Sequence, residues 1–287
     1  MKLSTEIQSI AKIVGMEKAV QLCAGAGFDG WDFSMFDMCQ IDWGTGLPLD
    51  NPNPLNGPGY LKFARQLKQI GLDNGIVCNQ SHAPHPVGVS AVRGFLKRAI
   101  ECTAEAGGQI CVIHPDGDKT PAQNAEMYAE LLPFAKECGV KLATENMWNW
   151  DSGKNRSSFA ACATGASFVE HIDLLHDPAL VACLDIGHAE MQGSGEGAVN
   201  MIRTLGHRLQ ALHIHDNDRW HDCHQIPGSM DIDFDAVIRA LREVGYSGWF
   251  TLEAYRFLEG YTEETVFDGV KRLRDSVARL EEMFLRA

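Results

Sequence analysis

The feature that most restricts the fold of this chain is a repeated pair of segments, one short and apolar, the next longer and amphipathic. Eight short segments have the length and composition of strands: 3–7, 30–35, 75–82, 110–114, 141–147, 180–187, 209–216 and 248–255. Helical patterns follow them at 17–27, 59–72, 90–107, 121–139, 165–176, 195–206, 232–245 and 262–286. Strands that alternate with helices form parallel sheets. Eight such units without a second block of sequence predict an α/β fold, a closed (β/α)8 TIM barrel, as a single domain over residues 1–287.

Local signals agree with this division. In the pattern at 232–245, Phe234, Val237 and Leu241 recur at helical spacing. Gly139 and Gly245 stand where helices are expected to end. The first strand leads into QSIAKIVGMEK and not into a Gly-x-Gly-x-x-Gly turn, which disfavours an open dinucleotide-binding sheet.

Charge and cysteine usage restrict the partners. The formal net charge of −13 disfavours nucleic acid and anionic membrane surfaces, because a polyanion must be met by Lys and Arg. The nine cysteines form no Cys-x-x-Cys pair, so we expect reduced thiols and a cytoplasmic protein. The first twenty residues lack the apolar run of a secretory signal, and no apolar stretch reaches the roughly 18 residues of a membrane span.

Residues of metal-binding type end six consecutive predicted strands. They are His82, His114, Glu145, Asp185 followed by His188, His213 with His215, and Glu253. The carboxyl ends of barrel strands carry the catalytic side chains, so these residues should meet at one mouth. Buried carboxylates and imidazoles gathered there are unfavourable without cations. The sequence therefore predicts a divalent metal ion, and oxygen and imidazole ligands suit Mn²⁺, Mg²⁺, Co²⁺ or Zn²⁺.

The alternation of side chains along a strand refines this prediction. Glu145 shares a face with Ala143 and is expected to point toward the barrel axis. His213 and His215 also share a face, so either one can be the ligand. Three further acidic residues, Asp151, Asp216 and Asp231, are assigned to capping or salt bridges.

Aromatic residues are concentrated in two of the loops at this mouth. The second strand and the long loop that follows it offer Trp31, Phe33, Phe36 and Trp43, together with the apolar Leu47, and the fifth loop offers Trp148 and Trp150. These rings either stack on a sugar or pack the loops onto the barrel. The density of Pro and Gly at 45–59 predicts an ordered lid.

Four motifs together resemble the xylose-isomerase-like barrel superfamily over nearly the whole chain. They are CLDIGHAE, the strand end ENM, HIHDN followed by HQIPGSMDIDF, and TLEA. The superfamily includes sugar isomerases, epimerases, inosose dehydratases and endonucleases of the endonuclease IV type.

The epimerase branch implies one divalent ion, held by Glu145, Asp185, His213 and Glu253. Glu145 and Glu253 would also act as acid and base in proton abstraction next to a carbonyl, through a metal-stabilised enediolate. His188, His215, Arg219 and Trp148 are predicted to bind a small sugar, keto-sugar or cyclitol. The predicted function is a sugar isomerase or epimerase. An inosose-type dehydratase with the same site and a barrel that only binds sugar remain alternatives, and a homo-oligomer is possible.

The endonuclease branch implies three zinc ions and a longer ligand list. Carried onto this chain, the list is His82, His114, Glu145, Asp185, His188, His213, Asp222, His224 and Glu253. Five of these, His82, His114, His188, Asp222 and His224, are therefore candidates for a second metal or for substrate. The predicted rim, however, has only five basic residues, Lys119, Lys154, Arg156, Arg219 and Arg256, and more acidic ones. A duplex-binding face needs many phosphate contacts, so we expect no nucleic acid partner. The four carboxylates Glu145, Asp185, Asp222 and Glu253 balance two divalent ions at most, so we expect one tightly held ion, with a second possible around His188, Asp222 and His224.

Overall fold

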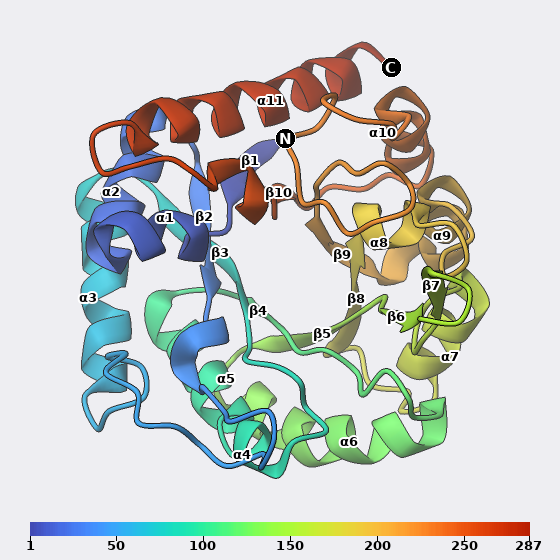
Figure 1. Cartoon of the computed structure of the whole chain (residues 1–287), viewed down its shortest axis with the longest axis horizontal. Helices are drawn as coiled ribbons and strands as arrows, with labels where there is room; N and C mark the ends of the chain where they lie inside the picture. Colours follow the sequence, from blue (N-terminus) through green and yellow to red (C-terminus); the bar gives the residue numbers. More distant parts are fainter.

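A computed structural model describes all 287 residues as a ring of eight parallel strands enclosed by helices (Figure 1). The ring strands are β1 (Lys2–Thr5), β2 (Gly30–Ser34), β3 (Val77–His82), β4 (Ile110–Val112), β5 (Lys141–Glu145), β8 (Leu180–Asp185), β9 (Leu209–His213) and β10 (Trp249–Leu252). Strands β2-β3-β4-β5-β8-β9 form one sheet in that order, and β1 pairs with β10.

Two parallel bridges close the ring where these two sheets meet. Glu6 pairs with Asp32 just beyond β1, and Ile214 pairs with Leu252 just beyond β9. The Ile214 amide donates to the Thr251 carbonyl at 2.9 Å, and the Asp29 amide donates to the Leu3 carbonyl at 2.9 Å. The predicted (β/α)8 barrel is therefore confirmed.

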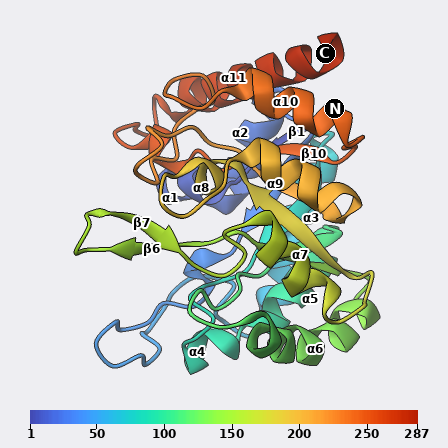
Figure 2. The ribbon, with the colours of Figure 1, turned by 90° about the vertical axis from the view of Figure 1, so that its right-hand side faces the viewer.

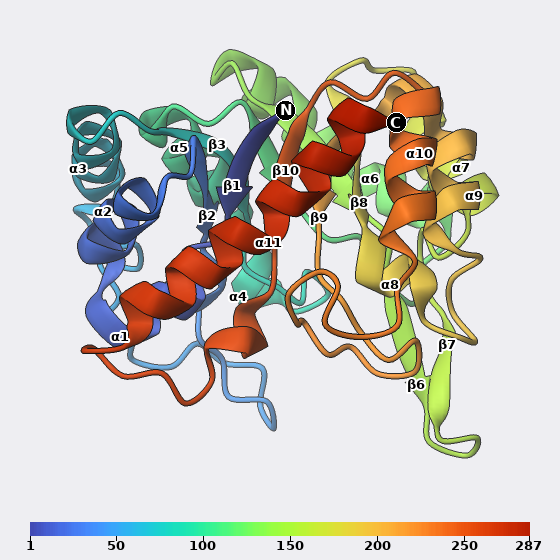
Figure 3. The same ribbon diagram turned by 90° about the horizontal axis from the view of Figure 1, so that it is seen from above.

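Eight helices form the outer layer around the strands, as Figures 1 and 3 illustrate. They are α2 (Met16–Ala26), α3 (Tyr60–Asp73), α5 (Leu96–Ala106), α6 (Pro121–Glu137), α7 (Gly165–Asp173), α9 (Ala198–Leu205), α10 (Phe234–Glu243) and α11 (Val266–Arg286). Each of these helices has buried apolar residues. Capping residues determine several starts: Thr120 and Gln123 form a capping box at α6. The carboxylate of Asp233 accepts from the Ala236 amide at α10.

Short elements that the periodicity does not predict lie among the loops. They are α1 (Gln8–Val14), η1 (Phe36–Met38), β6 (Trp148–Asp151), β7 (Arg156–Phe159), α8 (Ile186–Glu190), η2 (Gly206–Arg208) and η3 (Tyr255–Leu258). A further short helix, α4 (Ser90–Arg93), lies within a helix that was expected. The antiparallel β6–β7 hairpin projects from the barrel on the same side as the loop after η1 (Figure 2). The expected helix over 90–107 is divided into α4 and α5 around Gly94 and Phe95. Gly15, at a φ of 83°, separates α1 from α2.

The interior of the barrel has an apolar and a polar part. Small apolar side chains from neighbouring strands, among them Val112, Ala143 and Val181, form one buried cluster. A polar network crosses the interior: Ser4 Oγ donates to Thr251 Oγ1 at 2.8 Å, and Thr251 Oγ1 donates to Gln80 Oε1 at 3.3 Å. Branched apolar residues usually fill this space, so a buried polar network marks a departure that calls for a function.

All nine cysteines are free thiols, seven of them buried, as the sequence predicts. None of the helices has the length and apolar character needed to cross a bilayer.

Candidate metal centre

Four barrel strands deliver the predicted ligands to one place. Glu145, Asp185 and His213 are the last residues of β5, β8 and β9, and Glu253 follows β10 directly. In the sheet register Asp185 pairs with His213. All four side chains are at most 5% exposed, because strand alternation turns them inward, as the grouping of Glu145 with Ala143 predicts.

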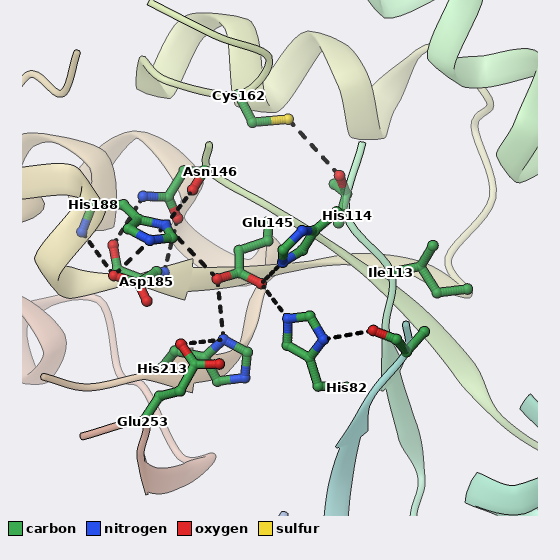
Figure 4. A network of polar contacts seen from close by, with 12 residues as sticks. His82, Ile113, His114, Glu145, Asn146, Cys162, Asp185, His188, His213 and Glu253 are labelled. Carbon is green, nitrogen blue, oxygen red and sulfur yellow. Dashed lines mark hydrogen bonds and ion pairs between the residues drawn. The ribbon is translucent and has the colours of Figure 1, made fainter. Parts of the chain in front are cut away.

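Glu145 lies at the centre of the group (Figure 4). Its Oε2 is 3.2 Å from His82 Nε2 and 3.3 Å from His114 Nε2. Its Oε1 is 3.1 Å from His213 Nδ1, and that nitrogen is 3.8 Å from Glu253 Oε2. One carboxylate therefore faces imidazole nitrogens from the ends of three other strands.

The donor atoms form five overlapping groups, each compact enough for one ion, and three of these groups together contain all of the His, Asp and Glu donors. One group is Glu145, Asp185, His213 and Glu253; a second is His188, His215, Asp222 and His224; a third is His82, His114 and Glu145. The structure thus brings together every candidate ligand named from the sequence. His215, named only as a substrate-binding residue or as an alternative to His213, lies in the second group.

Several donor atoms in these groups have no hydrogen-bond partner although they are buried. They are Glu145 Oε2, Asp185 Oδ2, His213 Nε2, His215 Nε2 and Asp222 Oδ1. Asp185 shows the distinction well: its Oδ1 accepts from the His188 amide at 2.7 Å as the N-cap of α8, while Oδ2 has no donor. Orphaned buried oxygens and nitrogens are costly, and divalent cations bind such donors. The donor set therefore fits a metal.

Four histidines of the cluster are oriented by backbone carbonyl groups. The Nδ1 atoms of His82, His188 and His224 lie 2.9, 2.9 and 2.6 Å from the carbonyl oxygens of Ala83, Asn146 and Glu253, and His215 Nδ1 lies 3.4 Å from that of Asp216. Donation from Nδ1 leaves Nε2 as the free lone pair. In each of the four, Nε2 faces a carboxylate of the cluster.

The two glutamates have opposite pKa shifts in the protein without ions. Burial raises the pKa of Glu145, but the charge of His213, its hydrogen bond to Oε1 and the close approach of the His114 and His82 imidazoles outweigh it, so the pKa lies well below the ordinary value. Burial, together with the like charges of Glu145 and Asp185, raises the pKa of Glu253 well above it. The environment thus distinguishes the two carboxyl groups.

A cavity of about 830 Å³ opens above the group. Its lining includes Glu145, Glu253, His82, His114, His188, Asp222, His224 and Trp148, whereas Asp185, His213 and His215 lie behind its surface. The indole of Trp148 is 6.4 Å from the His188 ring, edge-on. Lys12 is the single Lys or Arg among the lining residues, which also include Glu6, Asp37, Asp116 and Glu259.

Other residues predicted for this mouth lie elsewhere. Arg219 is absent from the cavity lining, and its side chain is 3.4 Å from Glu190 and half exposed. Trp31 and Phe33 are fully buried in the core, and Trp43 is 79% exposed, so of the aromatic residues after the second strand only Phe36 lines the cavity. Asp151 forms a salt bridge with Lys154 at 3.2 Å, as predicted, but Asp216 accepts from the Ile232 amide within a loop, and Asp233, not Asp231, caps α10.

Sequence reasoning missed several lining residues. His85 stacks on the ring of His114 with centroids 4.9 Å apart, whereas Phe36, which was expected at this mouth, lies edge-on to His82 at 4.4 Å. Glu6, buried at the end of β1, accepts from the amide of Ser9 at 3.0 Å. The signal for His85 was present in QSHAPHP, where a second histidine follows the strand end.

Gly187 permits the second donor group to form. A methyl group at position 187 would overlap the imidazole of His215. We expect Gly187→Ala to destabilise the protein by about 1–3 kcal/mol, because overpacking a buried site forces side chains from their rotamers. Chemical denaturation measures this change. Gly57→Ala is the matched control, since its Cβ would meet only the Pro54 carbonyl at 3.9 Å. Equal stability of the two variants would show that His215 is not packed against residue 187.

Known proteins match both the sequence and the fold. A sequence model of the xylose isomerase-like TIM barrel family matches residues 20–282. The fructoselysine 3-epimerase of Escherichia coli O157:H7 is 30% identical over 130 residues, which is 45% of this chain and 44% of that protein. The chain therefore matches less than half the length of this curated relative.

Solved structures are similar over almost the full length. A D-tagatose 3-epimerase-like protein superposes with a TM-score of 0.69 at 21% identity, covering 98% of this chain and 99% of the other. The IOLI protein with a bound zinc atom superposes with a TM-score of 0.70 at 17% identity, covering 98% of each chain. At these identities the similarity establishes the fold.

The family match extends over most of the barrel, including all four strands that carry the first donor group. The chain therefore belongs to the xylose isomerase-like TIM barrel family.

Proposed function

We propose that the chain is a divalent-metal-dependent isomerase or epimerase that moves a proton next to the carbonyl of a small sugar, keto-sugar or cyclitol. The observation that carries this proposal is the pair Glu145 and Glu253. Both carboxylates line one cavity and both lie within 3.8 Å of His213 Nδ1. The names of the relatives, fructoselysine 3-epimerase and D-tagatose 3-epimerase-like protein, support this reaction class.

The two glutamates supply the proton transfers. A carboxylate within hydrogen-bond reach of a carbon-bound proton acts as general base, and the second carboxyl group returns a proton as general acid. The two residues come from β5 and from the end of β10, three strands apart in the ring, so they approach a bound sugar from different directions. Removal of a proton from one face of a substrate carbon, followed by return of a proton to the other face, inverts the configuration of that carbon. His188 and Trp148 line the same cavity and hold the sugar.

The cation belongs to the group of Glu145, Asp185, His213 and Glu253. It would supply positive charge beside the negative charge that develops on the substrate oxygens. Three carboxylates and one imidazole suit Mn²⁺, Co²⁺, Zn²⁺ or Mg²⁺. The zinc atom in the IOLI protein supports a divalent ion in this barrel. The group of His188, His215, Asp222 and His224 is a second, weaker site.

The substrate is not phosphorylated in this proposal. Acidic groups dominate the cavity wall, and Lys12 is the one basic residue among the lining. A phosphate needs several cationic or amide donors, which bidentate Arg side chains usually provide. A neutral sugar needs only hydrogen bonds and an apolar face, and both are present.

Metal content tests the proposal. Dialysed protein is expected to retain about one equivalent of a divalent metal, with a second equivalent bound only when metal is added in excess. The charge of three carboxylates around the first group favours tight binding there. Elemental analysis and titration after chelation measure both. Absence of stoichiometric metal in protein refilled with Mn²⁺, Co²⁺ and Zn²⁺ in turn would contradict the proposal.

One observation favours a second candidate, a metal-dependent phosphodiesterase. Three donor groups adjoin here, as the ligand list of the endonuclease branch implies. The rim opposes this candidate, since Lys119, Lys154 and Arg219 are each within 4.0 Å of a carboxylate and none lines the cavity. Three tightly held metal equivalents would favour the phosphodiesterase.

A dehydratase remains distinguishable by its product. Release of water from a cyclitol ketone, detected as a dehydrated product, would favour the dehydratase.

A further inference from the structure

Asp32 is a buried carboxylate of the barrel wall that lies outside the cavity lining. It is 1% exposed and belongs to β2. The register between β2 and β3 shifts between Trp31 and Asp32, where a bulge interrupts the ladder. Bulges re-aim side chains and are common beside active sites. The shift places Asp32 opposite Gln80 and aims its carboxylate into the barrel interior.

The histidine nearest to Asp32 is oriented differently from the others in the cluster. His213 presents Nδ1, and not Nε2, to the cation group, where Glu145 Oε1 is 3.1 Å away. Its other nitrogen, Nε2, faces Asp32 Oδ2 at 3.5 Å and has no other partner. The four histidines His82, His188, His215 and His224 instead have a backbone carbonyl behind the ring. His213 alone has a carboxylate there.

Asp32 is itself held in place by the polar network of the interior. Gln80 Nε2 donates to Asp32 Oδ2 at 2.9 Å, and Gln80 Oε1 accepts from Thr251 Oγ1 at 3.3 Å. The remaining oxygen, Asp32 Oδ1, is buried without a partner. Asp32 Oδ2, which accepts from Gln80 Nε2, is also the oxygen that faces His213 Nε2, and a carboxylate oxygen can accept a second hydrogen bond, here from the imidazole.

We propose that Asp32 is a positioning residue of the cation centre, which accepts a hydrogen bond from His213 Nε2 and so directs the Nδ1 lone pair of His213 at the ion. The inference rests on the proposed function, since it needs an ion in the group of Glu145, Asp185, His213 and Glu253. A neutral imidazole has one donor and one acceptor nitrogen, so fixing the proton on Nε2 frees Nδ1. A carboxylate acceptor also makes the ring a stronger ligand than a carbonyl does.

Binding of Co²⁺ by full-length Asp32→Asn tests this inference. The amide retains the shape and can still accept from Gln80 Nε2. It lacks the charge that strengthens the histidine. Competition with a chromophoric chelator is expected to show Co²⁺ affinity about 10–100-fold below wild type, the usual effect of losing such an outer partner. The d–d absorption of bound Co²⁺ should change, because the imidazole is no longer held in one orientation.

Glu6→Gln is the matched control, because it removes a neighbouring buried carboxylate that contacts Ser9 and no histidine. Its Co²⁺ affinity should stay close to wild type. If Co²⁺ affinity fell equally in both variants, the loss would come from removing any nearby negative charge, and the inference would be overturned. Unchanged affinity in Asp32→Asn, with wild type binding normally, would also overturn it, whereas a wild type without Co²⁺ affinity contradicts the proposed function itself.

Stability separates positioning from a purely structural role. Thermal unfolding of the metal-free protein should change little in Asp32→Asn, while the stabilisation that Co²⁺ adds should shrink. If Asp32→Asn does not fold, Gln80→Met is the alternative variant, because it removes the hydrogen bond that holds the Asp32 carboxylate in place. This variant should also bind Co²⁺ more weakly than wild type, and wild-type affinity in it would contradict the inference.

Discussion

Glu145→Gln and Glu253→Gln are each expected to lower turnover by about 10²–10⁴-fold, the range associated with losing a general acid or base. Each change also removes one negative ligand from the first donor group. The amide is nearly isosteric, so packing around Glu145 should be conserved. Initial rates on a panel of ketoses and cyclitol ketones, at saturating Mn²⁺ or Co²⁺, measure the loss.

Glu126→Gln is the control for this pair. Glu126 is exposed on α6, is not among the residues that line the cavity, and makes no ion pair. Its turnover and its melting temperature should equal those of wild type. Near-native turnover of either Glu145→Gln or Glu253→Gln, with metal bound, would remove that residue from the acid–base pair. Isotope exchange would then identify the remaining base.

The barrel could be predicted because two periodicities alternate along the whole chain. The spacing of Phe234, Val237 and Leu241 describes the buried stripe of α10, and these residues are buried. The location of the site could be predicted from the same strand pattern. In a parallel barrel the carboxyl ends of all strands lie together, so residues at these ends share one site. Glu145 and Asp185 could therefore be predicted without knowledge of tertiary structure beyond the order of the strands.

The parts that could not be predicted depend on geometry that no periodicity encodes. The choice between His213 and His215 follows from which ring reaches Glu145, and the structure places His213 there, at 3.1 Å. The role of Asp32 depends on a bulge, which shifts register without a distinctive residue. Arg219 follows a strand end in sequence, but its loop turns it toward Glu190 and away from the cavity.

The β6–β7 hairpin was not predicted from the sequence for a different reason. Trp148 and Trp150 alternate with polar residues over only four positions, too short a run to distinguish a strand from a loop. Pairing with residues 156–159 makes the segment a strand, and that pairing is a tertiary fact. The consequence for the site is that Trp148 reaches the cavity from a hairpin and not from an irregular loop.

Proton exchange in heavy water is expected with at least one ketose or cyclitol ketone, and cleavage of abasic duplex DNA is not. Exchange reports the shared abstraction step even when the panel only approximates the true substrate. It should appear with Mn²⁺ or Co²⁺ and disappear after chelation, because the developing charge on the substrate oxygens then lacks its counter-charge. Mass spectrometry of the recovered sugar measures the incorporated deuterium.

The acidic wall of the cavity explains why DNA should fail in the same protein. Duplex binding depends on releasing counterions from phosphates by Lys and Arg, and even non-specific binders reach only about 10⁻⁴–10⁻⁶ M at physiological salt. Here Lys12 is the one basic lining residue, beside Glu6, Asp37, Asp116 and Glu259. Binding of an abasic duplex should therefore be undetectable at about 150 mM salt, and ketose phosphates should exchange more slowly than the free ketoses. Specific cleavage of the duplex, without proton exchange across the sugar panel, would contradict the proposed isomerase or epimerase and support a phosphodiesterase.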